Sequence, residues 1–137
     1  MENVFNKISL VIGIIGGIAA KLLGGFDTLT VALLTLMVFD YITGIIKSVI
    51  SKNLSSKIGY VGILKKVLIL CIVCVSVVIQ SILPDALPIR EITLIFFLCN
   101  EGLSIIENSA QIIPLPEKLK EVLLQLRDTD KNKNDSK

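Results

Sequence analysis

The segment VLILCIVCVSVVIQSILP, which runs from Val67 to Pro84, contains no charged residue over its 18 positions. A β-strand seldom exceeds about ten residues, so the β-branched side chains of this segment do not favour a strand. A helix that crosses a bilayer needs about 20 mostly apolar residues. The segment therefore predicts a membrane-spanning helix, and the rest of the chain must fit that prediction.

The whole chain of 137 residues is apolar, with 53% hydrophobic and only 19% charged residues. Residues 107–137 hold 12 of the charged side chains, which leaves too few in residues 1–106 to cover a soluble domain. The net charge of +2 argues against a nucleic-acid partner. The absence of histidine excludes imidazole catalysis and histidine-ligated metals. We therefore expect an all-α integral membrane protein that is not an enzyme and has no cofactor or metal.

Three further apolar segments accompany the first one. Together the four segments predict a transmembrane domain over residues 1–113, built as a small bundle of three to four helices. Three interpretations of the N-terminal segment stay open: it spans the membrane, it lies in the interface, or it is a cleaved signal peptide. The predicted spans are residues 8–23, 28–46, 67–84 and 92–113.

The chain beyond residue 113 is more polar. Pro116 and Glu117 are typical of a helix start, and an apolar stripe then recurs at helical spacing. We predict an amphipathic cytoplasmic helix over residues 114–127, either on the membrane surface or paired with another copy. The polar residues 128–137 alternate in charge, so we predict that they are disordered.

A basic loop sets the predicted orientation. Between the second and third spans the chain carries five lysines and no acidic residue. Basic residues in short loops mark the cytoplasmic side of a membrane, and they lie near anionic headgroups there. This loop and the C-terminus are therefore predicted to be cytoplasmic. The five lysines are Lys47, Lys52, Lys57, Lys65 and Lys66.

Two carboxylates fall inside predicted spans, Asp40 at ~18 Å and Glu101 at ~15 Å below the outer face. An ionised acid near mid-bilayer costs about 2.5–3.5 kcal/mol on insertion scales, so it normally faces other helices or water. Asn100, beside Glu101, can hydrogen-bond across helices. These three residues either line a pore or oligomer interface, or form a satisfied hydrogen bond within one subunit with one acid protonated. A proton relay lacks its usual histidine or paired basic residue.

Small residues in the first segment recur every four positions, at Ser9, Gly13 and Gly17. Such rows let two helix backbones approach closely in lipid. The row is equally consistent with self-association and with packing inside one subunit. Gly44, near the end of the second span, is a further helix-packing candidate.

Five short motifs occur in order along the chain, and together they resemble the phage-lysis and toxin-secretion holins of Gram-positive bacteria and their phages, including those beside large clostridial toxins. The likeness covers about residues 28–127. The motifs are FDYITG at 39–44, LSSKIG at 54–59, GILKK at 62–66, NEGLSIIEN at 100–108 and PLPEKLK at 114–120.

The resemblance implies a function that composition does not show. Holins accumulate in the bacterial cytoplasmic membrane and then assemble as homo-oligomers into large lesions. A murein hydrolase, or in some systems a toxin, passes through without binding the holin directly. The lipid bilayer and further copies of the chain are thus the expected partners. The alternatives are a small ion channel or transporter that uses the intramembrane acids, and a non-conducting membrane scaffold.

Overall fold

The computed structural model describes residues 1–83 and 87–132, without the side chains of residues 123 and 126–132. Every regular element in these ranges is an α-helix, and no strand occurs in them. The predicted all-α class is confirmed. The helices are α1 (Glu2–Leu22), α2 (Thr28–Ile50), α3 (Ser56–Ile82), α4 (Ile89–Ala110) and α5 (Glu117–Asn132).

Local signals explain where the helices begin and end. The Asp27 carboxylate accepts a hydrogen bond from the Thr30 amide at 3.0 Å and caps the start of α2. The Ser55 hydroxyl accepts one from the Ile58 amide at 3.3 Å and caps α3. Gly24 has a positive φ, 75°, which glycine adopts without steric cost, so the chain turns directly after α1.

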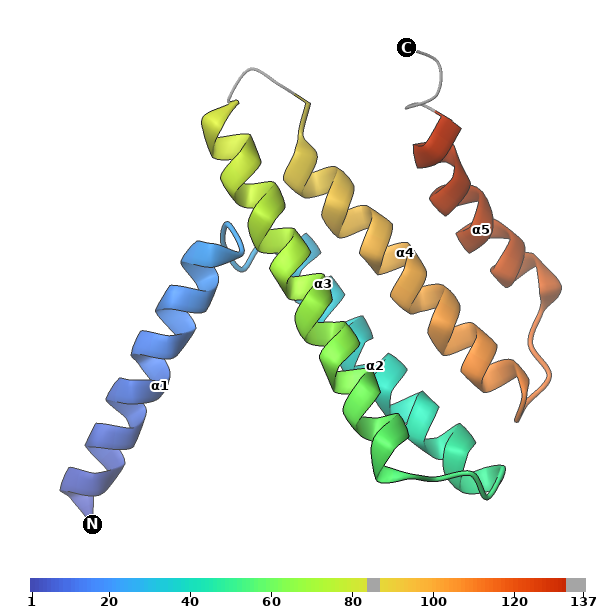
Figure 1. Cartoon of the computed structure of the whole chain (residues 1–137), viewed down its shortest axis with the longest axis horizontal. Helices are drawn as coiled ribbons and strands as arrows, with labels where there is room; N and C mark the ends of the chain where they lie inside the picture. Colours follow the sequence, from blue (N-terminus) through green and yellow to red (C-terminus); the bar gives the residue numbers. More distant parts are fainter. Residues whose placement is uncertain (84–86, 133–137) are drawn as a thin grey trace.

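Helices α2, α3 and α4 form the bundle and alternate in direction along it (Figure 1). Helix α4 packs against both α2 and α3, and α5 runs back beside α4. The buried core is small, because most apolar side chains point outward, as a lipid-facing surface requires. Its main cluster consists of Leu23, Leu33, Met37, Val73 and Leu94. Cys99 and Leu103 are also buried.

Helix α1 diverges from this bundle (Figure 1) and has no buried residue. A β-carbon at Gly13 or Gly17 would meet nothing within 4 Å. Within the described residues, no other helix of the protomer packs against this row of small residues, which includes Ser9. The structure therefore does not show the row packing inside one subunit.

Three helices, α1, α2 and α3, are long and apolar enough to cross a membrane. The protein is therefore an integral membrane protein. Helix α4 has 22 residues, but it carries charged side chains that include Arg90, Glu101 and Glu107. Composition alone consequently does not mark α4 as a span.

The predicted basic loop is the main correction to the sequence-based boundaries. Helix α3 begins at Ser56, well before residue 67, so only residues 51–55 link α2 and α3. The Ser55 cap starts the helix early, and the lysines that follow are good helix formers. Lys52 alone lies in the link, whereas the other four lysines are helical, namely Lys47, Lys57, Lys65 and Lys66.

The chain ends also differ from the expected boundaries. Helix α1 begins at Glu2 rather than at residue 8, and α4 covers Ile89–Ala110 rather than 92–113. Helix α5 continues to Asn132, beyond its predicted end at residue 127, and residues 133–137 lie outside the described ranges. No glycine or proline interrupts residues 117–132, so nothing local stops the helix earlier.

Candidate functional site

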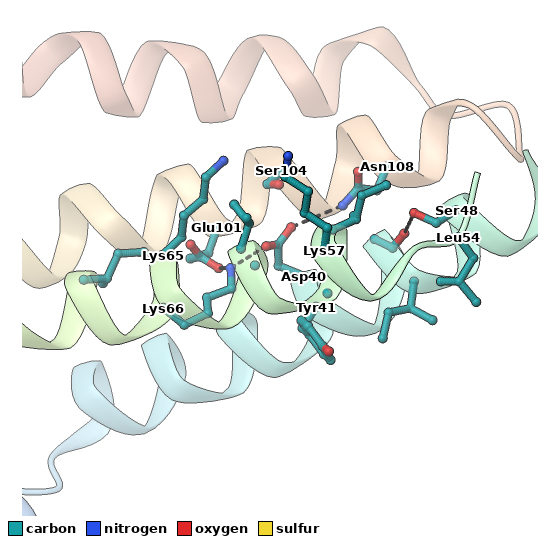
Figure 2. Close-up of a pocket in the computed structure, with 17 residues that line it drawn as sticks. Asp40, Tyr41, Ser48, Leu54, Lys57, Lys65, Lys66, Glu101, Ser104 and Asn108 are labelled. Carbon is teal, nitrogen blue, oxygen red and sulfur yellow. Dashed lines mark hydrogen bonds and ion pairs between the residues drawn. The ribbon is translucent and has the colours of Figure 1, made fainter.

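An ion cluster joins the three helices of the bundle. The Lys66 ammonium on α3 donates to the carboxylate of Asp40 on α2 and to that of Glu101 on α4 (Figure 2). The side chains of Lys66, Asp40 and Glu101 are only 16%, 15% and 7% exposed. One cation thus holds together two acids from helices that are distant in sequence.

Helix geometry brings these groups to one level. Helix α2 ends at Ile50 and α3 begins at Ser56, so Asp40 and Lys66 stand equally far from the link, at ~15 Å along their helices. Because the two helices run in opposite directions, equal distances from the link place the residues opposite each other. The similar depth expected for Asp40 and Glu101 agrees with their shared contact to Lys66.

A second polar side chain from α4 completes the cluster. The Asn108 amide donates to Asp40 Oδ1 at 3.2 Å and to Thr43 Oγ1 at 3.3 Å. Asn108 lies two helical turns after Glu101, so both residues project from the same face of α4. Sequence analysis missed this role of Asn108, and the seven-residue spacing from Glu101 was the available signal.

Asn100, in contrast, stays outside the cluster. It is only partly buried, and in the ranges that the structure describes it makes no hydrogen bond to Asp40 or Glu101. Adjacent helix residues point about 100° apart, so Asn100 and Glu101 cannot share one face. The sequence-based grouping of Asn100 with the two acids is therefore not reproduced.

Lys66 is the residue that the sequence assigned to the wrong environment. Its place among five lysines favoured a cytoplasmic loop, but it lies inside the bundle between two acids. It is also the paired basic residue that seemed to be missing for a proton relay. One ammonium thus faces two carboxyl groups within the cluster.

A cavity of about 510 Å³ opens beside the cluster and extends toward the α2–α3 link (Figure 2). Asp40, Lys66 and Glu101 line its inner end, Lys65 lines it beside Lys66, and Lys57 lines it farther out, near the link. Gly44 also faces this region, where a β-carbon would lie 3.7 Å from Asn108 Nδ2. The absence of a side chain at Gly44 thus leaves room for the Asn108 contacts between α2 and α4.

A second ion cluster lies at the opposite end of the bundle. Arg90 is 6% exposed and binds both carboxylate oxygens of Asp27, at 2.8 and 3.1 Å. It also donates to the Leu23 carbonyl at 2.8 Å and to the Thr30 hydroxyl at 2.7 Å. These contacts fasten the α1–α2 link to the start of α4. The hydrogen bonds from Arg90, and then the one from the Thr30 amide, hold the pKa of Asp27 well below its usual range.

Comparison with known proteins places this arrangement in a family. The chain matches the bacteriophage holin family over residues 17–128. An uncharacterised 14.9 kDa protein in the nagH 3′ region of Clostridium perfringens is 41% identical over 92% of this chain and 97% of that protein. A probable holin of Bacillus phage phi105 is 39% identical over 58% of this chain and 59% of its own. No solved structure matches the chain.

The family match starts within α1 and ends within α5, so it contains the complete α2–α4 bundle and its ion cluster. The relative from Clostridium perfringens strain 13 extends the likeness, at 39% identity, to the full length of both proteins. The chain therefore belongs to the bacteriophage holin family.

Proposed function

We propose that this protein acts as a holin: it collects in the bacterial cytoplasmic membrane and assembles into lesions wide enough for folded proteins. The observation that carries the proposal is the family match over residues 17–128. The three helices that are long and apolar enough to cross a membrane support the membrane location that such a role needs. The cargo is a murein hydrolase or a toxin, which passes through the lesion without binding the protein.

We place the ion cluster at the centre of the mechanism. In a dispersed subunit, Lys66 neutralises Asp40 or Glu101, so a polar group can stay buried between helices at low cost. When many copies pack together, the same three side chains can face water between subunits. Lesion formation then exchanges ion pairs within a subunit for hydrated groups along a wet interface.

The proposed topology follows from the lysine distribution. The link between α2 and α3, with Lys47, Lys52 and Lys57 at or near it, is cytoplasmic, and α4 returns the chain to that side. The C-terminus is then cytoplasmic. In a bilayer we expect α5, half of whose residues are charged, to leave α4 and lie at the surface.

Cysteine labelling tests this topology. In a chain with its three native cysteines replaced by alanine, Lys118→Cys should react with a membrane-impermeant maleimide only after the cells are opened. Leu87→Cys, on the opposite link, should react in intact cells. Reaction of both variants in intact cells would contradict a cytoplasmic C-terminus.

Controlled expression with a signal-less murein hydrolase tests the function. Culture turbidity should fall abruptly after a delay, and only when both proteins are present. Asp40→Leu and Glu101→Leu should insert normally but abolish or mistime lysis, because each alters the wet interface. Normal lysis timing in both variants would remove the cluster from the mechanism, although the holin assignment would still stand.

One observation favours a second candidate, a small ion channel or transporter. A basic residue paired with acids inside a membrane bundle is typical of proton and ion pathways, and Lys66 has this position. A channel would depolarise the cell without releasing the hydrolase. A chain that inserts but causes neither effect would instead be a non-conducting scaffold.

A further inference from the structure

The cavity between α2, α3 and α4 has two chemically different parts. At its inner end Asp40 and Glu101 are already bound to Lys66, and Asp40 also accepts from Asn108. Its walls between the cluster and the α2–α3 link are largely aliphatic, with contributions from Ile45, Ile58 and Val61 among others. An occupant of this outer part would therefore meet apolar surface along much of its length.

The free charges of the outer part are positive. Lys57 lines it near the link, and Lys65 lines its boundary with the inner end; both are exposed, and neither forms an ion pair within the ranges that the structure describes. In Figure 2 both ammonium groups extend from α3 to the same side, toward α4. The two residues are separated by ~12 Å along the helix, so a group between them can be approached by both side chains.

The start of α3 adds to this positive charge. The amino end of a helix carries a partial positive charge and unpaired backbone N–H groups, and Lys57 lies in the first turn of α3. No acidic side chain occurs from Tyr41 to Gln80 to offset it. An aliphatic wall beside a cationic rim at a membrane surface matches a phospholipid whose headgroup is anionic.

We propose that the outer part of this cavity binds one anionic phospholipid of the leaflet next to the α2–α3 link. The phosphate lies between Lys57 and Lys65, and one acyl chain lies against Ile45, Ile58 and Val61. Free phosphate would leave those aliphatic walls uncovered, so a lipid is the better match. The site is separate from lesion formation, and its test does not require a lesion.

Tyrosine fluorescence provides a local reporter. The chain has no tryptophan and two tyrosines, of which Tyr41 lines the cavity and Tyr60 is 64% exposed. The Tyr60→Phe protein, reconstituted in phosphatidylcholine vesicles, therefore reports from Tyr41 alone. Brominated phosphatidylglycerol should quench this fluorescence at a lower mole fraction than brominated phosphatidylcholine does.

Two matched double variants decide the origin of that preference. Lys57→Gln with Lys65→Gln should remove most of the preference for phosphatidylglycerol, because each lysine contributes about a fivefold difference in affinity. Lys47→Gln with Lys52→Gln removes the same charge from residues that do not line the cavity, so the preference should persist. Circular dichroism checks that both variants remain helical. Equal losses in the two variants, or no preference in the Tyr60→Phe protein, would overturn the proposal.

Discussion

At the scale of single residues, the three members of the ion cluster do not contribute equally to stability. Removing either acid leaves Lys66 paired with the remaining one, whereas removing Lys66 leaves two buried carboxylates without a cation. Breaking a buried ion pair by deleting one partner typically costs far more than the pair contributes. Lys66 is therefore the member on which the bundle depends most.

Lys66→Met should lower the free energy of unfolding in detergent by about 3–5 kcal/mol. Lys65→Met, on the exposed neighbouring position, should change it by about 0.5 kcal/mol or less. Asp40→Asn and Glu101→Gln should fall between these two. Denaturant titration followed by circular dichroism gives all four values, and similar losses in the Lys65 and Lys66 variants would refute a buried cluster.

Asp27 predicts a pH dependence at the opposite end of the bundle. Arg90 holds the pKa of Asp27 below its unfolded value of about 3.9, so the carboxylate stabilises the fold fully above about pH 4. That stabilisation is lost as the pH falls further, toward the folded-state pKa. Because 48% of the Asp27 side chain is exposed, water screens the pair and the effect is about 1 kcal/mol.

Unfolding of the wild-type chain and of Asp27→Asn should be compared between pH 6 and pH 3. The wild type should be the more stable of the two at pH 6, and this advantage should shrink toward pH 3. An advantage that stays constant or grows on acidification would show that Arg90 does not hold the folded carboxylate ionised.

Residue counting could predict part of this site. It placed Asp40 and Glu101 at similar depth, since depth follows from helical rise alone. It could not assign Lys66, because one loop rule was applied to all five lysines, and only the α3 cap at Ser55 shows that this residue is deep inside a helix. The contact of Asn108 with Asp40 could not be predicted, because the sequence does not show which face of α4 meets α2.

At the scale of elements, sequence predicted which helices exist better than where they end. Apolar segments mark part of a helix, but the helix continues past its apolar segment wherever no residue stops it. Helix α3 extends to Ser56 and α5 to Asn132 for this reason. The sequence could not show which helices pack together, since the row of small residues in α1 was compatible with packing inside the protomer or against another copy.

Gly44 tests the contact between α2 and α4. Alanine should be tolerated, since a β-carbon there would lie 3.7 Å from Asn108 Nδ2, an ordinary contact distance. Leucine should displace Asn108 from Asp40 and cost about 1–3 kcal/mol of unfolding free energy. Thermal unfolding in detergent measures both variants, and a Gly44→Leu chain as stable as Gly44→Ala would contradict the packing described here.

The row of small residues in α1 tests self-association. Gly13→Ile with Gly17→Ile should leave the protomer folded, because nothing lies within 4 Å of either site, but it should reduce dimer yield on chemical cross-linking in membranes. Ile14→Leu with Ile18→Leu, at the same spacing on a neighbouring face, is the control. Unchanged dimer yield in the glycine variant would exclude this row from the interface.

At the scale of the whole molecule, the protein has a small buried core and an apolar outer surface. These features are consistent with a protein whose surface is covered by lipid and by further copies. Helix α1 exposes its apolar side chains along its length, and the bundle is joined by ions at two levels. This division favours a subunit that is stable alone in the membrane yet able to associate. The central claim is that association opens a path for folded proteins.

The most direct measurement of that claim uses purified chain in vesicles loaded with a small dye and a folded fluorescent protein. As the protein-to-lipid ratio rises, both cargoes should escape together above a threshold, because one large lesion passes both. Escape of the dye alone at every ratio would contradict the holin account and favour a channel. Retention of both cargoes by vesicles that contain inserted protein would contradict it as well.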